Sequence, residues 1–338
     1  MTVGVVLAVV VALAFALTNG FHDAANAIAT LVATRVARPV QAVILAAVFN
    51  LIGPFVIGSA VANTVGKIIE LPPDQTVAVI GAGLTGAVIW NLVTWSRGIP
   101  SSSGHALVGG LVGAGLLTAG VDAIEWGPVS DGHIAGVFGI LIVLAVAPIL
   151  AAVAAFLVEK VALRLLRRAT VRAGRSIGKA QWFTSAGLAF SHGSNDAQKS
   201  VGIIAAVLVA AGLIPTLGDV PPWVILASSA MLTLGTAFGG WNIVKTIGRR
   251  IYPIREIDGL VSQGTSASLI LTASIIGAPV STTQVVSSSI VGIGVGRGRY
   301  RHVGWEVVRD ILVAWVTTIP AAAVIAALSL PFWRFIAA

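Results

Sequence analysis

The chain of 338 residues contains no cysteine. Disulfide bonds, thiolate catalysis and cysteine-ligated metal sites are therefore excluded. Charge is also scarce, because Asp, Glu, Lys and Arg make up only 10% of the residues, whereas soluble globular proteins carry about 25%. Acidic residues are fewer than basic ones, and the net charge is +8. In so apolar a chain this excess indicates basic cytoplasmic loops, so no nucleic-acid partner is expected.

Apolar residues make up 57% of the chain and gather in stretches of roughly twenty. Examples are Val40–Ala62, Thr76–Trp95, Ile134–Val158, Val224–Val244 and Ile311–Leu330. Each is long enough to cross a hydrocarbon core of about 30 Å. Residues 1–17 lack the basic start and cleavage site of a signal peptide, and are expected to form the first span. The pattern predicts an all-α polytopic membrane protein with about 10–12 membrane segments, some of them re-entrant.

The longest polar stretch, residues 159–180, divides the chain nearly in half. Its basic residues are Lys160, Arg164, Arg167, Arg168, Arg172, Arg175 and Lys179. This excess predicts a cytoplasmic linker between a first half, 1–158, and a second half, 181–338. Other basic and acidic loops alternate along the chain, which gives five crossings per half and an N-terminus outside the cell. An odd number of crossings reverses the second half, so an inverted-topology repeat is expected.

Three pairs of short motifs support this repeat and occur in the same order in both halves. The pairs are "HDAAN" (22–26) with "NDAQK" (195–199), "TVGK" (64–67) with "TIGR" (246–249), and "GIPSSSGH" (98–105) with "GAPVSTTQ" (277–284). Any one match is weak, but three in order indicate duplication. Inverted repeats of this kind are typical of secondary transporters.

One acidic residue interrupts an apolar segment early in each half, Asp23 in the first and Asp196 in the second. An ionised carboxylate inside a bilayer costs ~3 kcal/mol or more, so each must face a cavity or a partner. The turn-forming residues Thr18–Gly20 and Gly193–Asn195 precede them. We therefore expect two helices broken at mid-membrane, with the acids coupling transport to a cation or proton. A polar cluster that only satisfies helix ends is the alternative.

The two acidic motifs differ at one position, where Asn26 in the first half corresponds to Lys199 in the second. Lys199 lies three residues after Asp196, within reach on a helix. Our hypothesis is that its ammonium takes the place of a cation, while Asp23 and Asn26 keep an open site that suits Na⁺. A static ion pair that only positions helices is left open. The predicted coupling residues are Asp23, Asn26, Asp196 and Lys199, with His22, His105 and His192 as candidates for a proton relay.

The third motif pair places a proline and several hydroxyl residues before an apolar run, which is typical of a helix start. Hydroxyls and free backbone N–H groups at a helix N-terminus form an anion site. Two such sites facing each other would hold a tetrahedral oxyanion, although ordinary helix capping is the alternative for each. The predicted anion-binding residues are Ser101, Ser102, Ser103, Ser281, Thr282 and Thr283.

Ser102 and His105 also raise the alternative of an intramembrane serine hydrolase. No G-x-S-x-G elbow is present, and Gln284 takes the place of the histidine in the second copy. The chain also lacks a Walker A motif, which argues against ATP drive. We therefore expect a secondary transporter that is not an enzyme and has no bound cofactor.

At these motifs the chain resembles the PiT family of inorganic phosphate transporters. That family carries an Asn-Asp-x-x-Asn type motif and a Pro-x-Ser-Thr-Thr-His type motif in each half. Here they read "FHDAANA", "GSNDAQKS", "PSSSGHA" and "PVSTTQV", and the likeness spans residues 19–320. "SHGSNDAQKS" and "LVSQGTSAS" look most like the bacterial low-affinity branch.

The resemblance implies that the six hydroxyl residues contact phosphate. It also implies that the coupling site consists of Asp23, Asn26, Asn195 and Asp196. It implies import across the bacterial cell membrane by symport with H⁺, with Na⁺ as the alternative ion. A divalent metal carried along with phosphate and a homodimer are also implied. A sulfate permease of the same superfamily is a further alternative.

The chain departs from the family pattern at several positions. His22 stands where Asn usually precedes the first Asp, and Gly104 replaces a hydroxyl residue. Gln284 replaces the second His, so a relay through that motif must rest on His105. Sodium-coupled members keep Asn in both halves, so Lys199 argues against a plain two-site sodium mechanism.

Overall fold

The computed structural model describes residues 2–127, 136–168 and 171–337, with the side chains of Ala24 and of residues 171–175 left out. The first half contains α1 (Val3–Ala33), α2 (Pro39–Ile57), α3 (Ala60–Gly66), α4 (Pro73–Ser96), α5 (Ser103–Ala119) and α6 (Gly136–Leu165). The second contains α7 (Val171–Ala210), α8 (Pro222–Phe238), α9 (Trp241–Lys245), α10 (Glu256–Ile275), α11 (Thr282–Gly296) and α12 (Trp305–Ala337). A π-helical turn, η3 (Thr246–Arg250), continues α9. The described part of the chain is all-α and holds no strand.

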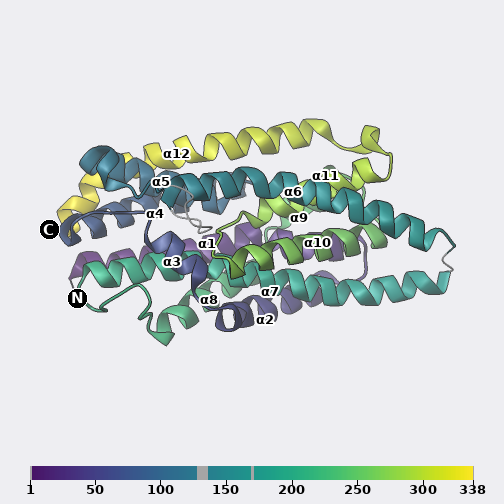
Figure 1. Ribbon diagram of the computed structural model, residues 1–338, viewed down its shortest axis with the longest axis horizontal. Coiled ribbons are helices and arrows are strands. Elements are labelled where there is room, and N and C mark those ends of the chain that lie inside the picture. The colour runs from purple at the N-terminus through teal and green to yellow at the C-terminus, as the bar shows by residue number, and fades with distance from the viewer. Residues whose placement is uncertain (1, 128–135, 169–170, 338) are drawn as a thin grey trace.

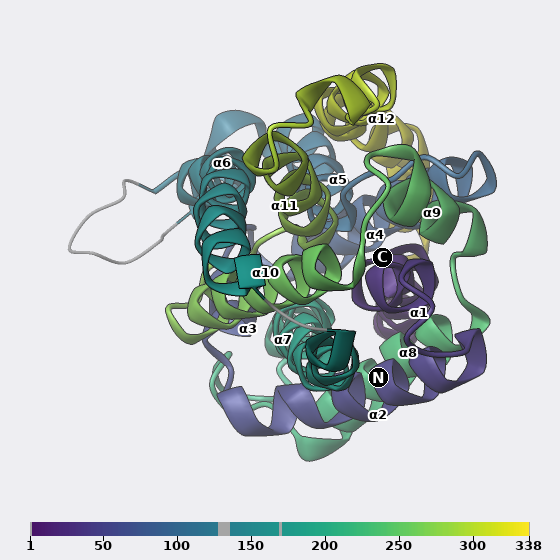
Figure 2. The ribbon, with the colours of Figure 1, turned by 90° about the vertical axis from the view of Figure 1, so that its right-hand side faces the viewer.

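The helices form an elongated bundle, and most of them run along its long axis (Figure 1). Both chain termini lie at one end, and the α6–α7 connection lies at the other. Viewed from that second end, α2, α6 and α12 lie at the periphery of the bundle (Figure 2). α1 and α7 run in opposite directions along the axis, because α1 starts at the end where α7 finishes.

Six described helices are long and apolar enough to cross a membrane. A seventh span results if α8 and the segment Trp241–Arg250, which are bent by 64° at their junction, are counted together. The chain is therefore a multi-pass membrane protein, although this count is lower than the 10–12 segments expected. The difference arises because α7 and α10 carry many polar residues, and α11 has only 15 residues.

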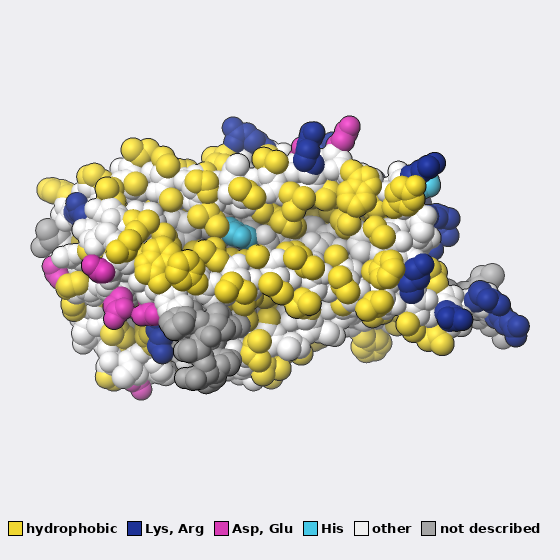
Figure 3. Space-filling view, turned by 45° about the horizontal axis from the view of Figure 1, so that its top comes forward, with side chains coloured by type: hydrophobic (Ala, Val, Ile, Leu, Met, Phe, Trp, Pro, Cys, Tyr) yellow, Lys and Arg dark blue, Asp and Glu magenta, His cyan; other side chains and the backbone are white. Residues whose placement is uncertain are grey.

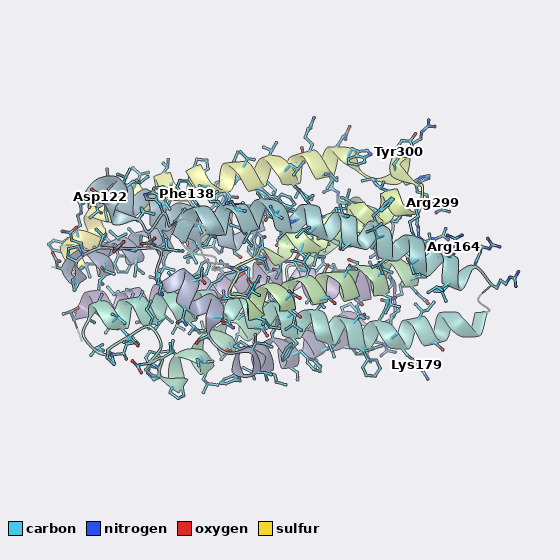
Figure 4. The ribbon with its side chains drawn as sticks, viewed as in Figure 1. Asp122, Phe138, Arg164, Lys179, Arg299 and Tyr300 are labelled. Atoms are coloured by element: carbon cyan, nitrogen blue, oxygen red, sulfur yellow. The ribbon has the colours of Figure 1, made fainter. Side chains whose placement is uncertain are left out.

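Charge is divided between the two ends of the bundle (Figure 3). Lys and Arg gather at the end that holds the α6–α7 connection, and acidic side chains gather near the termini. Figure 4 places Arg164, Lys179 and Arg299 at the first end and Asp122 at the second. By the positive-inside rule this distribution predicts that the α6–α7 end is cytoplasmic and that the end with the termini is the outer one.

The expected mid-membrane breaks at Asp23 and Asp196 are wrong, because α1 and α7 continue through both acids. The glycine before each acid serves close packing instead of a turn. A Cβ on Gly20 would lie 2.1 Å from the Leu232 carbonyl oxygen of α8, and one on Gly193 would lie 2.3 Å from that of Asn50 in α2. Only glycine allows the two helix crossings at these positions.

The hydroxyl residues near these glycines also fit inside a continuous helix. Thr18 donates to the Phe15 carbonyl oxygen at 3.0 Å, and Ser194 donates to that of Phe190 at 2.7 Å. Such back-bonding satisfies a polar side chain without interrupting the helix. Residues typical of turns in water therefore remain helical here.

Two helical hairpins turn inside the bundle and provide the re-entrant elements that the sequence predicts. α4 and α5 form the first, and its tip, residues 98–103, is buried from residue 100 onward. α10 and α11 form the second, with a buried tip at residues 277–281. Asp122, just after α5, lies at the end that holds the termini, whereas Arg299, just after α11, lies at the α6–α7 end. The hairpins therefore enter the bundle from opposite ends.

The basic stretch predicted as a linker is largely helical, since α6 extends to Leu165 and α7 begins at Val171. Its first residue, Glu159, is fully buried. The Arg297 guanidinium lies 3.0 Å from Oε1 of Glu159 and 2.5 Å from Oδ1 of Asp258. This ion cluster joins α6, α10 and the C-terminal end of α11.

Candidate functional site

The two hairpin tips meet at the carboxylate of Asp23 on α1. Ser103, at the start of α5, donates to Oδ2 of Asp23 at 3.0 Å. Thr283, at the start of α11, donates to Oδ1 at 2.7 Å. One buried carboxylate therefore binds the first helical turn of a hairpin from each half.

Asp196 on α7 has a comparable set of partners, and one of them is a cation. Thr282 donates to Oδ2 of Asp196 at 3.1 Å, and the Lys199 ammonium forms an ion pair with Oδ1. Lys199 also donates to the Val280 carbonyl oxygen at 2.7 Å. Lys199 and Asp196 are each only 1% exposed. Because such burial is tolerated only when charges are paired, the pair neutralises the second half of the site.

The two predicted asparagines attach the second hairpin to α1 and α7. Asn26 donates to Thr283 Oγ1 at 2.8 Å, so this hydroxyl bridges Asn26 and Asp23. Asn195 donates to the Ala278 carbonyl oxygen at 3.1 Å and accepts from the Val280 N–H at 3.2 Å. Asp23 and Asn26, the two residues of the predicted open cation site, are therefore linked through the Thr283 hydroxyl.

His22 extends the cluster around Asp23 toward the first hairpin. Its Nδ1 lies 3.0 Å from Oδ1 of Asp23. Its Nε2 lies 3.1 Å from Oγ of Ser101 and 3.3 Å from Oγ1 of Thr94. The imidazole therefore connects the acid of α1 to the tip of the α4–α5 hairpin.

His192 connects Asp196 to a chain of hydrogen bonds between α7, α2 and α8. Its Nδ1 lies 3.0 Å from Oδ1 of Asn50, and Asn50 donates through Nδ2 to Thr236 at 3.0 Å. Thr236 donates in turn to the Leu232 carbonyl oxygen. On its other side, Nε2 of His192 lies 2.9 Å from Oδ2 of Asp196, in an ion-pair contact that lacks the angle of a linear hydrogen bond.

The remaining predicted residues have local roles in this structure. Ser102 caps α5 by accepting from the His105 N–H at 3.2 Å, and Ser281 caps α11 by accepting from the Gln284 N–H at 3.4 Å. The His105 ring is buried, and its Nδ1 has no hydrogen-bond partner among the described residues. The structure therefore does not bring His105 into the contacts that join His22 and His192 to the two acids.

The acids of the two halves lie close enough to share a cation. Asp23, His192 and Asp196 each offer one ligand atom, and these atoms lie within 4.8 Å of one another. Two buried carboxylates at this separation repel strongly unless positive charge lies beside them. The set of one imidazole nitrogen and two carboxylate oxygens can hold a proton or a metal ion.

Sequence reasoning missed the polar residues that orient the histidines, namely Asn50, Thr94 and Thr236. Each lies inside a long apolar segment, and all are buried. Polar residues buried in a membrane need partners, so their presence in such segments was the available signal.

Comparison with known proteins identifies the family. A model described as "Phosphate transporter family" matches residues 19–176 and 167–326. The chain belongs to the phosphate transporter family. A probable low-affinity inorganic phosphate transporter of Rhizobium meliloti (strain 1021) is 43% identical over 86% of this chain and 84% of its own length. The corresponding protein of Bacillus subtilis (strain 168) is 39% identical over 86% of this chain and 85% of its own length.

A solved structure, "The sodium-dependent phosphate transporter", has the same fold. It superposes on this chain with a TM-score of 0.86 at 24% sequence identity. The superposition covers 98% of this chain and 99% of the chain of the solved structure. The PiT resemblance is thus confirmed, and this phosphate transporter is a multi-pass protein of the cell membrane. The family consists of transporters, so the hydrolase alternative is excluded. In agreement, Ser102 Oγ accepts from the His105 backbone.

Proposed function

We propose that this phosphate transporter imports inorganic phosphate by symport with protons. The proton that couples phosphate entry to proton entry would lie between His192 and Asp196. The observation that carries the proposal is the orientation of His192. Its two ring nitrogens face two oxygen atoms, Oδ1 of Asn50 at 3.0 Å and Oδ2 of Asp196 at 2.9 Å.

The hydrogen-bond chain determines which nitrogen carries a proton. Thr236 uses its single hydroxyl hydrogen on the Leu232 carbonyl oxygen, so it accepts from Nδ2 of Asn50. Oδ1 of Asn50 must then face the ring, and Nδ1 of His192 donates to it. A neutral imidazole therefore leaves the Nε2 lone pair against a carboxylate oxygen. The contact is stable only with a second proton on His192 or one on Asp196.

Lys199 supports proton coupling over sodium coupling at this position. Its ammonium contacts Asp196 and the Val280 carbonyl oxygen, the oxygen ligands that a bound Na⁺ would use. The first half has Asn26 at the corresponding position. We infer that Lys199 is a built-in substitute for a cation, so the second half is neutral without Na⁺ and the charge that moves with phosphate is a proton.

The phosphate would bind between the N-termini of α5 and α11. A Cβ on Gly104 would lie 3.6 Å from the Lys199 Nζ atom, so the first turn of α5 faces the ammonium across a small distance. Backbone N–H groups, hydroxyls and one cation form a suitable anion site. Ser103, Thr282 and Thr283 now donate to the two acids. We propose that protonation of this cluster frees those hydroxyls for phosphate.

The proposed mechanism is alternating access by two inverted repeats. Two observations support the repeat: α1 packs on α8 at Gly20, and α2 packs on α7 at Gly193. These glycines correspond in the two halves, since Gly20 and Gly193 each lie three residues before the acid. Hairpins that enter from opposite ends would expose a shared site to each side in turn.

Sodium symport is the second candidate, and unpaired amide atoms favour it. Oδ1 of Asn26 and both amide atoms of Asn19 are buried without a hydrogen-bond partner among the described residues. A carbonyl oxygen in that state could bind Na⁺ or a divalent metal beside Asp23. The solved relative is named sodium-dependent, but at 24% identity it informs on the fold alone.

Purified protein in sealed liposomes would distinguish these candidates. The membrane potential is clamped and the buffer contains no sodium. An inward proton gradient of about one pH unit is then expected to drive uptake of labelled phosphate at least about tenfold above the rate without a gradient, because one pH unit is a tenfold ratio in proton activity. An inward Na⁺ gradient at equal pH is expected to add nothing. Arsenate should compete and sulfate should not. Uptake driven by Na⁺ alone would contradict proton symport, and competition by sulfate would contradict phosphate selectivity.

A further inference from the structure

Two threonines, one from each half, contact the hairpin tip of the opposite half. Thr64 on α3 donates to the Gly277 carbonyl oxygen at 2.8 Å. Thr246, at the start of η3, donates to the Gly98 carbonyl oxygen at 3.3 Å. Thr64 and Thr246 begin the matching motifs "TVGK" and "TIGR", and Gly98 and Gly277 begin the matching motifs "GIPSSSGH" and "GAPVSTTQ". The two contacts are therefore equivalent and crossed between the halves.

Each contact requires glycine at the hairpin tip. Gly98 has φ +65° and Gly277 has φ +74°, a region that other residues rarely adopt. A Cβ would lie 3.1 Å from Cβ of Asn242 at Gly98, and 3.1 Å from the Ala60 carbonyl oxygen at Gly277. The hairpin tip is thus packed closely against the Ala60 backbone at Gly277 and against Asn242 at Gly98.

The two hydroxyls can release the hairpins at low cost. Thr64 also reaches the Ala60 carbonyl oxygen at 3.2 Å within its own helix, and Thr246 reaches that of Asn242 at 3.1 Å. When a hairpin moves away, each hydroxyl keeps this second acceptor. Opening therefore leaves neither hydroxyl as a buried donor without an acceptor. An unsatisfied buried group is the main penalty for breaking a hydrogen bond in an apolar interior.

A cavity of about 770 Å³ reaches the first of these contacts. Thr64 and Gly277 line it together with Lys67, Glu70 and Glu125. Glu125 follows Asp122, which lies at the outer end of the bundle. Only three residues separate Gly277 from Ser281, where the proposed phosphate site begins. The cavity therefore leads from outside to the Thr64–Gly277 contact.

The coupling motif itself supports both sides of this outer contact. Gln198 on α7 accepts from the Val61 N–H at 2.9 Å and so holds the start of α3. Asn195, one turn earlier, holds the hairpin tip at Ala278. In the first half the residue corresponding to Gln198 is Ala25, which has no side chain to do the same. A change of protonation at Asp196 would thus reach the outer contact directly.

We propose that Thr64–Gly277 is the outer gate of the transport path and that Thr246–Gly98 is the inner gate. The inference rests on the proposal that phosphate binds between the hairpins. It assigns a gating role to four residues outside the phosphate and coupling sites. One pair would close the path on the outer side of the membrane and the other pair on the inner side.

The absence of native cysteine makes a direct test available. Single cysteines are placed one residue beyond each gate, as Ala278→Cys and Ile99→Cys, and their labelling by a membrane-impermeant maleimide is timed in vesicles of known orientation. Loss of one hydrogen bond of about 1 kcal/mol shifts an equilibrium about fivefold. Thr64→Val is expected to raise labelling of Ala278→Cys from outside by about fivefold. It should leave labelling of Ile99→Cys from inside unchanged, and Thr246→Val should do the reverse.

Two further variants complete the test. Gly277→Ala pushes the tip away from α3 and is expected to act like Thr64→Val. Thr272→Val, whose exposed hydroxyl bonds only to the Ser268 carbonyl oxygen of its own helix, should change neither rate. Equal changes on both sides, or no change with Thr64→Val and Gly277→Ala, would overturn the assignment. Labelling needs no turnover or coupling ion, so a failed gate is distinguishable from a failure of proton symport.

Discussion

Replacement of Lys199 by methionine is expected to reduce phosphate uptake by about a hundredfold or more. Lys199 is a buried partner of Asp196, and the Met side chain fills a similar volume without charge. Removing one member of a buried ion pair leaves the other uncompensated, at a cost of about 3–5 kcal/mol. Each 1.4 kcal/mol is a factor of ten, which gives the expected loss. The measurement is uptake of labelled phosphate per folded transporter.

Two control variants separate charge from folding. Lys179→Met removes an exposed lysine near the α6–α7 end and is expected to leave uptake within about twofold, as surface substitutions usually cost under about 0.5 kcal/mol. The double variant Lys199→Met with Asp196→Asn removes both charges, so it should recover the amount of folded protein without recovering uptake driven by a pH gradient. Near-normal uptake by Lys199→Met alone would mean that the ion pair has no role in coupling.

Replacement of Thr283 by valine is expected to lower kcat/KM for phosphate about thirtyfold or more. The Thr283 hydroxyl donates to Asp23 and accepts from Asn26, so its loss removes one hydrogen bond from each of two buried polar groups. A hydrogen bond contributes about 0.5–1.5 kcal/mol between neutral groups and about 1.5–3 kcal/mol when one partner is charged, and about 2 kcal/mol is a factor of about thirty. Because Thr283 is also a proposed phosphate ligand, much of the loss should appear in KM. Initial rates over a range of phosphate concentrations measure this.

Thr265→Val is the matched control for Thr283→Val. Thr265 lies in the same hairpin, and its hydroxyl bonds only to carbonyl oxygens of its own helix, Val261 and Ser262. Its kcat/KM is expected to stay within about twofold of wild type, because valine keeps the shape and no partner is left unpaired. If both threonine variants lose activity equally, the effect belongs to the α10–α11 hairpin as a whole and not to the bridging hydroxyl.

The sequence predicts much of the site because membrane burial makes polar residues costly. Asp23, Asp196 and Lys199 stand out from apolar surroundings, and the structure places them together with the hydroxyls of the hairpin motifs. The proposed repeat would account for their convergence, since corresponding residues of two interlocked halves meet near the same centre. The contact between Lys199 and Asp196 follows from their spacing on one helix.

The local shape of α1 and α7 was not predictable from the same residues. Thr18–Gly20 and Gly193–Asn195 are turn residues in water, where the backbone can bond to solvent. In the bundle, the glycines admit α8 and α2, and the hydroxyls bond within their own helix. Tertiary packing overrides local preference here, and the pattern carries no information about which neighbour will pack against a glycine.

The capping roles of Ser102 and Ser281 mark a second limit of sequence reasoning. A hydroxyl before a helix is compatible with capping and with anion binding, and both serines now cap. The role of His192 likewise depends on Asn50, which lies 142 residues away in the chain. A partner this distant leaves no local signal.

Comparison of net accumulation with exchange tests the central claim most directly. His192→Asn replaces the ring with the residue found at the corresponding position of the first half, Asn19. Liposomes carrying the variant are assayed for exchange of internal with external labelled phosphate, and separately for accumulation driven by an imposed pH gradient without Na⁺. Exchange needs no net proton release, so its rate should remain within about twofold of wild type. Accumulation should fall by about tenfold or more, because proton transfer at one positioned group contributes about a hundredfold or more. Accumulation that persists, or the loss of both activities together, would contradict a coupling proton between His192 and Asp196.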